Sequence, residues 1–226
     1  MRWSLGMALV LVAGQGLAQG SAPATVRPYL WSSDRPKSSI GEINVFRRFS
    51  NERTEAMREF YGEVLGLPVL PATALGGNQM IRYPVGGSEV KLFPVAPSPA
   101  NTAGIADAAG VRVLTFFYAS EAPVAQRFTD HGLPVPSFAP TAAYAGAKSA
   151  TLLQDPDGEW VELVVVPGAS PEALARFEIG ITVNDLAASR AFYGDVMGLQ
   201  AQPPVRDDRL GAVKYPFTHG LSLIHI

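Results

Sequence analysis

Cysteine is absent from this chain of 226 residues, so disulfide bonds and a lipid anchor on an N-terminal cysteine are both excluded. Charged residues are also scarce. They make up 17% of the sequence, the net charge is −2, and no run of lysine or arginine occurs. This argues against nucleic acid and against an anionic membrane as partners. Apolar residues are abundant: 47% of the chain is hydrophobic, which is enough to bury a core and excludes a disordered chain.

The first 18 residues have the pattern of a secretory signal peptide. Arg2 supplies a positive charge, residues 3–13 are apolar but too short to span a membrane, and Ala18 ends a small-x-small cleavage site. Cleavage after Ala24 is the second choice, and an uncleaved anchor is the alternative interpretation. Residues 19–37 are expected to form a leader arm. The mature protein is therefore predicted to be secreted or periplasmic and not membrane-bound.

An internal repeat organises the rest of the chain. The octapeptide FYGEVLGL at residues 60–67 recurs as FYGDVMGL at residues 192–199, an offset of 132 residues that also relates Tyr83 to Tyr215. A repeat that keeps its register across unlike loops indicates a structural duplication. Residues 38–167 are therefore predicted to form one complete domain, and residues 176–226 the first module of a second.

Each module is predicted to run strand, helix, strand, strand, strand. The apolar spacing and the turn residues place the strands and helices within three stretches. The first stretch has strands at 40–47, 67–70, 80–85 and 89–95 and a helix at 52–65. The second has strands at 111–118, 133–135, 149–154 and 159–166 and a helix at 123–131. The third has strands at 178–184, 210–217 and 221–226 and a helix at 185–197.

These residues resemble the vicinal oxygen chelate superfamily, which includes glyoxalase, bleomycin resistance proteins and extradiol dioxygenases. Three motifs carry the resemblance: the octapeptide, QDPDGEWVELVVV at residues 154–166, and FEIGITVNDLAASRAFYGDVMGL at residues 177–199. The resemblance implies an α+β fold in which paired βαβββ modules form a curled mixed sheet around a cup, with the helices outside. The DPDG segment itself is interpreted as a turn that needs no function.

The family usually binds a divalent metal through four side chains that face the cup. The residues at these positions are Glu42, Lys91, Val113 and Glu162. The assignment of Glu42, which matches Glu178 of the second repeat, requires a four-residue insertion. A charged lysine has only donors and cannot ligate a metal. The resemblance thus implies either no metal or a weakly bound divalent metal at Glu42 and Glu162. Two alternatives are a polar cluster with Lys91 between the carboxylates, and a misalignment that leaves some of these residues solvated.

Strand alternation predicts the wall of the cup. The residues expected to bind a substrate there are Asn44, Phe46, Lys91, Phe93, Thr115, Phe117 and Trp160. Four aromatic rings among a few polar groups suit a small apolar or aromatic molecule. The alternative is that the rings only fill a closed cup.

The expected function is the handling of a small organic molecule in the first cup, beside a degenerate metal site. The alternative is a metal-dependent lyase, isomerase or dioxygenase of the glyoxalase or extradiol kind whose working site needs the second domain. Because the repeat stops one module into that domain, the sequence predicts either a truncated gene, with residues 221–226 not native, or a homodimer formed through the unpaired C-terminal module.

Overall fold

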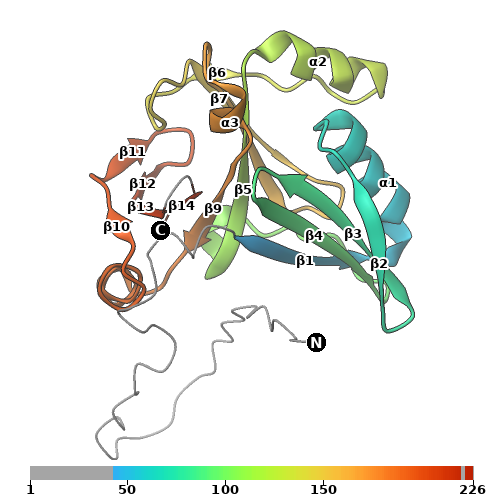
Figure 1. The fold of residues 1–226 in the computed structure, drawn as a ribbon, viewed down its shortest axis with the longest axis horizontal. Helices are drawn as coiled ribbons and strands as arrows, with labels where there is room; N and C mark the ends of the chain where they lie inside the picture. Colours follow the sequence, from blue (N-terminus) through green and yellow to red (C-terminus); the bar gives the residue numbers. More distant parts are fainter. Residues whose placement is uncertain (1–42, 220–221, 226) are drawn as a thin grey trace, which may run out of the picture. The chain divides into compact units, whose positions relative to one another are not determined.

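The computed structural model describes residues 43–219 and 222–225, which fall within one unit of the chain (Figure 1). The predicted signal peptide (1–18), the predicted leader arm (19–37) and Glu42 lie outside the described residues. No helix in the described part of the chain is long and apolar enough to cross a membrane.

Three βαβββ modules follow one another along the chain. Module 1 consists of β1 (Asn44–Ser50), η2 (Asn51–Arg53), α1 (Thr54–Arg58), η3 (Glu59–Val64), β2 (Leu70–Leu75), β3 (Asn78–Val85) and β4 (Ser88–Val95). After η4 (Ile105–Asp107), module 2 consists of β5 (Gly110–Tyr118), α2 (Glu121–Asp130), β6 (Ala139–Pro140), β7 (Ser149–Gln154) and β8 (Trp160–Val165).

A short linker helix, α3 (Pro171–Leu174), leads into module 3. This module consists of β9 (Phe177–Thr182), α4 (Leu186–Ala191), η5 (Phe192–Val196), β10 (Gln200–Ala201), β13 (Pro216–His219) and β14 (Ser222–His225). A separate hairpin of β11 (Val205–Asp207) and β12 (Ala212–Lys214) is inserted between β10 and β13.

The sheet order shows how the modules combine. In each module the first strand runs parallel to the last: β1 to β4, β5 to β8, and β9 to β14. Module 1 forms a four-stranded sheet of its own, whereas β5 and β9 pair antiparallel and join modules 2 and 3 into one eight-stranded sheet. The mixed α+β, glyoxalase-like fold is as predicted, but the expected first cup of modules 1 and 2 is not formed, because β9 occupies the edge of β5.

A shared apolar core separates the two sheets. On β1, Val45 and Phe49 are buried while Asn44 and Phe46 are exposed, so one face of the module 1 sheet points to the core. The module 1 helix packs Phe60 and Tyr61 into this core, and module 2 contributes side chains of α2, β5 and β8. The outer faces of the two sheets therefore point away from each other, with the core between the sheets.

The repeated octapeptide has the same backbone structure in both copies. It forms a π-helical turn, in which Leu65 N–H donates to Phe60 O at 2.8 Å and Met197 N–H donates to Phe192 O at 2.9 Å. A glycine with positive φ follows each turn, at Gly66 (74°) and Gly198 (69°). The helices were predicted to end at residues 65 and 197, directly before these glycines, whereas the π-helical turn was not predicted.

The strand register corrects the predicted alignment of the repeat. Phe46 pairs with Lys91 in module 1, and Glu178 pairs with Leu223 in module 3. Phe46 and Glu178 are 132 residues apart, and so are Lys91 and Leu223, which is the same offset that relates Phe60 to Phe192. The counterpart of Glu178 is therefore Phe46, and the four-residue insertion that placed Glu42 at this position is wrong.

Three other local predictions are wrong. Of the strand predicted at residues 67–70, only Leu70 is in a strand, because β2 runs over Leu70–Leu75. Residues 133–135 form no strand, and the short partner strand of module 2 is β6 instead. The single strand predicted at residues 210–217 is divided. Residues 210–211 lie in the turn between β11 and β12, where Gly211 has a positive φ of 62°, and β12 ends at Lys214 before β13 begins at Pro216. This turn creates the hairpin that the sequence pattern did not reveal.

The DPDG turn of module 2 is fastened to module 1. Tyr61 Oη–H donates to Asp155 Oδ2 at 2.8 Å, and Arg47 Nη1 lies 3.2 Å from Tyr61 Oη and 3.5 Å from Asp155 Oδ2. Nearby, Arg53 Nε donates to Asp157 Oδ1 at 2.6 Å. The turn was interpreted from its glycine and proline alone, but its two aspartates hold the modules together.

Candidate functional site

The candidate site lies on the outer face of the eight-stranded sheet, which we call the cup. Three neighbouring strands place Glu162 of β8, Thr115 of β5 and Glu178 of β9 side by side in register. All three residues are buried, with no exposed surface on either glutamate. The β11–β12 hairpin lies against this face, so the cup has the sheet as its floor and the hairpin as its cover.

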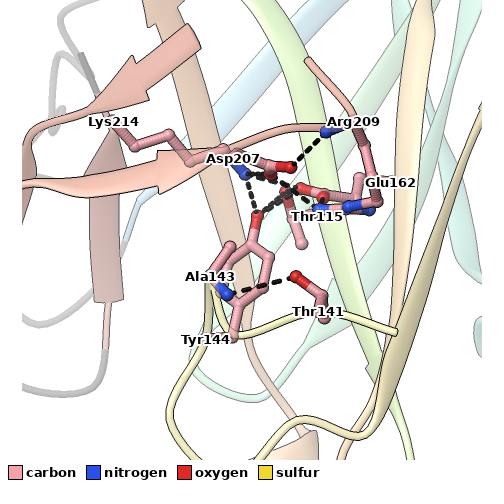
Figure 2. Close-up of polar contacts among 8 residues, drawn as sticks. All are labelled: Thr115, Thr141, Ala143, Tyr144, Glu162, Asp207, Arg209 and Lys214. Carbon is pink, nitrogen blue, oxygen red and sulfur yellow. Dashed lines mark hydrogen bonds and ion pairs between the residues drawn. The ribbon is translucent and has the colours of Figure 1, made fainter. Parts of the chain in front are cut away.

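Glu162 is the centre of a polar cluster (Figure 2). Its Oε2 accepts hydrogen bonds from Thr115 Oγ1 at 3.0 Å and from Tyr144 Oη, and it lies 3.3 Å from Lys214 Nζ. Its Oε1 accepts from Arg209 Nη2. Both carboxylate oxygens are therefore engaged by cations, and both cations come from the hairpin.

Asp207 of the hairpin completes the charge balance. It accepts from Arg209 Nη2 at 2.6 Å and lies 2.8 Å from Lys214 Nζ. Burial alone would raise the pKa of Asp207, but the hydrogen bonds and charges of Lys214 and Arg209 outweigh burial and lower this pKa. The aspartate consequently stays ionised and holds both cations in place.

Tyr144 is kept protonated by the same surroundings. Burial raises the pKa of Tyr144 well above its ordinary value of 10, and the charges of Glu162 and Glu178 raise it further. The phenol can therefore donate to Glu162 while its oxygen accepts from Lys214 Nζ at 2.8 Å. Its ring also packs edge-on against Phe117, with centroids 5.7 Å apart.

The second glutamate has its own cation. Arg176 Nη2 lies 3.5 Å from Glu178 Oε1, and the Arg176 guanidinium stands 4.3 Å above the ring of Phe117. Three buried carboxylates (Glu162, Glu178 and Asp207) thus face three cations (Arg176, Arg209 and Lys214). Among the described residues, these carboxylates and cations balance one another's charge, as buried charges require.

A cavity of about 80 Å³ lies between the sheet and the hairpin. Its polar side consists of Thr115, Tyr144, Glu162 and Lys214. The rest of its wall is mostly apolar and consists of Ile105, Val113, Gly180, Ile181, Thr182, Leu210, Ala212 and Val213. This combination of a few convergent polar groups with an apolar wall is typical of small-molecule sites.

The predicted site residues of module 1 do not reach this cavity. Asn44, Phe46, Lys91 and Phe93 lie together on the outer face of the four-stranded sheet. There the rings of Phe46 and Phe93 lie 5.7 Å apart, and Lys91 Nζ pairs with Glu89 Oε2 at 3.5 Å rather than with Glu162. Because the core lies between the two sheets, the expected single pocket of four aromatic rings does not form.

The predicted site residues of module 2 do lie in or beside the cup. Thr115 and Glu162 are in the polar cluster, and Phe117 supports Tyr144 and Arg176. Trp160 is half-buried, and its Nε1–H donates to Ala103 O at 3.1 Å. Its strand neighbour Val113 lines the cavity.

Sequence reasoning missed the residues that surround Glu162 in the polar cluster. Tyr144 lies in a long loop with no periodic pattern, and Asp207 and Arg209 lie in a hairpin that was not predicted. Lys214 directly precedes Tyr215, which the repeat relates to Tyr83, and this place in the repeat is the one signal that could have singled it out.

The cup does not fit the divalent metal that the resemblance implied. Glu42 lies outside the described residues, Lys91 is on the other sheet, and each oxygen of Glu162 already contacts a cation. A metal ion at Glu162 would face Arg209 and Lys214 at close range, which is electrostatically unfavourable. Within the described ranges, no group of three or more His, Asp or Glu side chains is close enough to hold a metal.

Comparisons with known proteins agree with this architecture. A sequence model of the Glyoxalase/Bleomycin resistance protein/Dioxygenase superfamily matches residues 47–163, which is more than half of the chain. A search of curated proteins finds no match.

Solved structures with the same fold are distant in sequence. A dioxygenase-like protein from Bacillus subtilis is 17% identical, with a TM-score of 0.60 over 80% of this chain and 61% of that one. Glyoxalase I from Zea mays is 16% identical, with a TM-score of 0.58 over 80% of this chain and 65% of that one. The chain therefore spans less than two thirds of either relative. At this level of identity, the likeness concerns the fold alone.

Proposed function

Because this chain belongs to the Glyoxalase/Bleomycin resistance protein/Dioxygenase superfamily, we propose that it binds a small organic molecule in the cup without a resident metal. The supporting observation is the polar cluster around Glu162, whose two oxygens are held by Arg209 and Lys214. The apolar cavity beside this cluster would take the body of the ligand.

The chemistry of the cavity wall suggests the kind of ligand. Thr115, Tyr144 and Lys214 are donors that already serve Glu162, so a ligand oxygen would compete for their hydrogen bonds. An apolar cavity of about 150 Å³ holds benzene, whereas this one measures about 80 Å³. A ring-sized ligand would therefore require the hairpin to move outward. The proposed ligand is a small apolar or aromatic molecule with one hydroxyl or carbonyl oxygen.

A titration of the full chain with phenol, after treatment with a chelator, tests this proposal. The indole N–H signal of Trp160, assigned with a Trp160→Phe variant, should shift because its strand neighbour Val113 lines the cavity. Val113→Phe should fill the cavity and abolish the shift. Val111→Phe is the matched control, since Val111 is on the same strand but 43% exposed. Unchanged binding to the Val113→Phe variant would rule out the cup as the site.

The second candidate function is a metal-dependent lyase, isomerase or dioxygenase. It is favoured by one feature, the placement of two fully buried carboxylates, Glu162 and Glu178, on either side of Thr115. The cations around Glu162 oppose it. Metal bound to the purified chain and lost on both Glu162→Gln and Glu178→Gln would favour this candidate over metal-free binding.

We also propose a homodimer, formed through module 1 rather than through the C-terminal module. Module 3 pairs through β9, whereas β1 has a neighbouring strand on one side only among the described residues. Thr115 of β5 and Glu178 of β9 are paired across the two strands. Phe46 holds the same position on β1, the first strand of module 1, as these two residues hold on the first strands of modules 2 and 3. An antiparallel pairing of two β1 strands would then place Phe46 opposite its own copy.

Cysteine cross-linking tests this register, because the chain contains no other cysteine. Phe46→Cys should form a disulfide-linked dimer, whereas Arg48→Cys alone should not. A mixture of Asn44→Cys and Arg48→Cys chains should also cross-link. A monomer in sedimentation at high concentration would contradict the dimer.

Secretion to the periplasm or the medium remains a proposal that rests on residues 1–18 alone. Sequencing the N-terminus of the exported protein tests it. A new N-terminus after Ala18 or Ala24 supports processing by signal peptidase, and an intact Met1 contradicts it.

A further inference from the structure

A second cavity, of about 240 Å³, lies where module 1, β5 and the linker helix α3 meet. We call it the junction cavity. It is three times the size of the cavity in the cup and shares none of its lining residues. Its wall comes from four segments that are distant in sequence, namely residues 65–68 and 84–86 of module 1, residues 116–118 of β5, and residues 174–176 of the linker.

The wall of the junction cavity is apolar and held in a defined shape. Its main surfaces are side chains of leucine, proline, valine and phenylalanine, among them Leu65, Pro84, Phe116 and Leu174. Gly86 has a φ of 60°, and a Cβ on it would stand 2.1 Å from Ala175 O, so only glycine lets the β3–β4 turn approach the linker this closely. Tyr118 Oη–H donates to Leu65 O at 2.9 Å and fixes the opposite wall.

One cation stands in this wall. Arg176 lines the cavity, with its guanidinium carbon 4.3 Å from the centre of the Phe117 ring. Its Nη2 faces Glu178 at 3.5 Å, and its buried Nε has no hydrogen-bond partner within the described part of the chain. A buried donor without a partner costs free energy, and a small rotation of the guanidinium would present it to an acceptor in the cavity.

We propose that the junction cavity binds a small monocarboxylate with a single ring or a short branched chain. The volume exceeds the roughly 150 Å³ that holds benzene, so one ring fits without movement of the backbone. The apolar wall suits the body of such a ligand, and a guanidinium is the side chain best matched to a carboxylate. A neutral ligand of the same size gains the apolar contact but not the charged one. The proposal does not rest on the function proposed for the cup, although Arg176 also pairs with Glu178 of the cup.

Titration of the full chain with benzoate, followed by calorimetry and by amide NMR, tests the proposal. Benzoate should shift the amides of residues 84–86 and 174–176, and benzyl alcohol should bind at least about tenfold more weakly, because a hydrogen bond to a charged group contributes about 1.5 kcal/mol or more. Leu174→Trp should fill the cavity and abolish benzoate binding. Arg176→Lys should keep the charge but weaken binding, because it loses the fork geometry.

Two outcomes would overturn the proposal. Equal affinities for benzoate and benzyl alcohol would remove the role of Arg176, and benzoate binding that survives Leu174→Trp would place the ligand elsewhere. Val113→Phe, which fills the cup, is the control that separates the two sites. It should leave benzoate binding unchanged, and a loss of benzoate binding there would show that the carboxylate occupies the cup instead.

Discussion

The same position in two modules has opposite surroundings. In module 2, Thr115 of the first strand faces Glu162 of the last, and both are buried beneath the β11–β12 hairpin. In module 1, Phe46 faces Lys91 in the same way, yet Phe46 is 41% exposed and Lys91 pairs with Glu89 on its own strand. One framework thus supports an enclosed ionic cluster in one module and an open aromatic face in the other.

This difference follows from what each first strand pairs with. The edge of β5 is occupied by β9, which brings Glu178 beside Thr115 and the hairpin over Glu162. Among the described residues, no strand occupies the free edge of β1. Two modules form a cup only when their first strands pair. The pairing of the first strand therefore decides whether the residues at these positions are enclosed in a site or exposed on an open sheet face.

The largest expected effect is on the enclosed cluster. Lys214→Met removes one of the two cations on Glu162 and Asp207 and should lower the free energy of unfolding by about 3–5 kcal/mol, since buried carboxylates lose their partner. Lys91→Met is the matched control in module 1 and should cost about 1 kcal/mol or less, because its pair is partly exposed. Urea denaturation of both variants measures the difference. Equal losses of unfolding free energy in the two variants would contradict the difference in burial between Lys214 and Lys91.

The repeated octapeptide offers a second matched pair. Phe60→Ala should cost about 3–4 kcal/mol, because its side chain is 4% exposed in the shared core. Phe192→Ala, at the same place in module 3, should cost about 1 kcal/mol, since this ring is 38% exposed. Thermal and urea unfolding of the two variants should rank them in this order. A larger loss for Phe192 would indicate that something covers module 3 in solution.

The smallest effect concerns pH and compares two aspartates. Asp207 has a lowered pKa, so its contribution to stability is present above the ordinary carboxyl pKa of about 3.9 and is lost as the pH falls through the folded pKa. Asp155 has a raised pKa, chiefly because burial outweighs the charge of Arg47, so its contribution is lost as the pH rises through the folded pKa.

Carboxyl-carbon NMR titration between pH 2 and pH 7 should resolve these two groups. The signal of Asp207 should titrate below the ordinary range and that of Asp155 above it. Hydrogen exchange at residues 205–214 should increase on acidification, as the hairpin loses its anchor. A titration order in which Asp155 ionises first would contradict the assignment.

The sequence predicted what local patterns determine. The strand alternation around Val45 and the end of the first helix before Gly66 follow from neighbouring residues. Asp185, where a helix was predicted to begin, caps α4 by accepting from Ala188 N–H at 2.9 Å. The strand that carries Glu162 was predicted at residues 159–166 in the same way, whereas the placement of Glu162 on the cup side came from the family resemblance.

The sequence did not predict what depends on distant partners. The choice of β9 rather than β1 as the neighbour of β5 leaves no trace in the periodicity of any of these strands. Tyr144 and Arg209 act from a loop and a turn, where no repeating pattern marks a buried polar group. The prediction that a lysine would neutralise Glu162 was right in kind, but Lys214 takes that place and Lys91 does not.

Metal analysis of the full-length purified chain tests the central claim, that cations of the hairpin take the place of a metal at Glu162. After expression with manganese, iron and zinc supplied, elemental analysis should find far less than one metal ion per chain, and Glu162→Gln should leave that content unchanged. One tightly bound metal ion per chain, lost on Glu162→Gln and retained in Lys91→Met, would contradict the account.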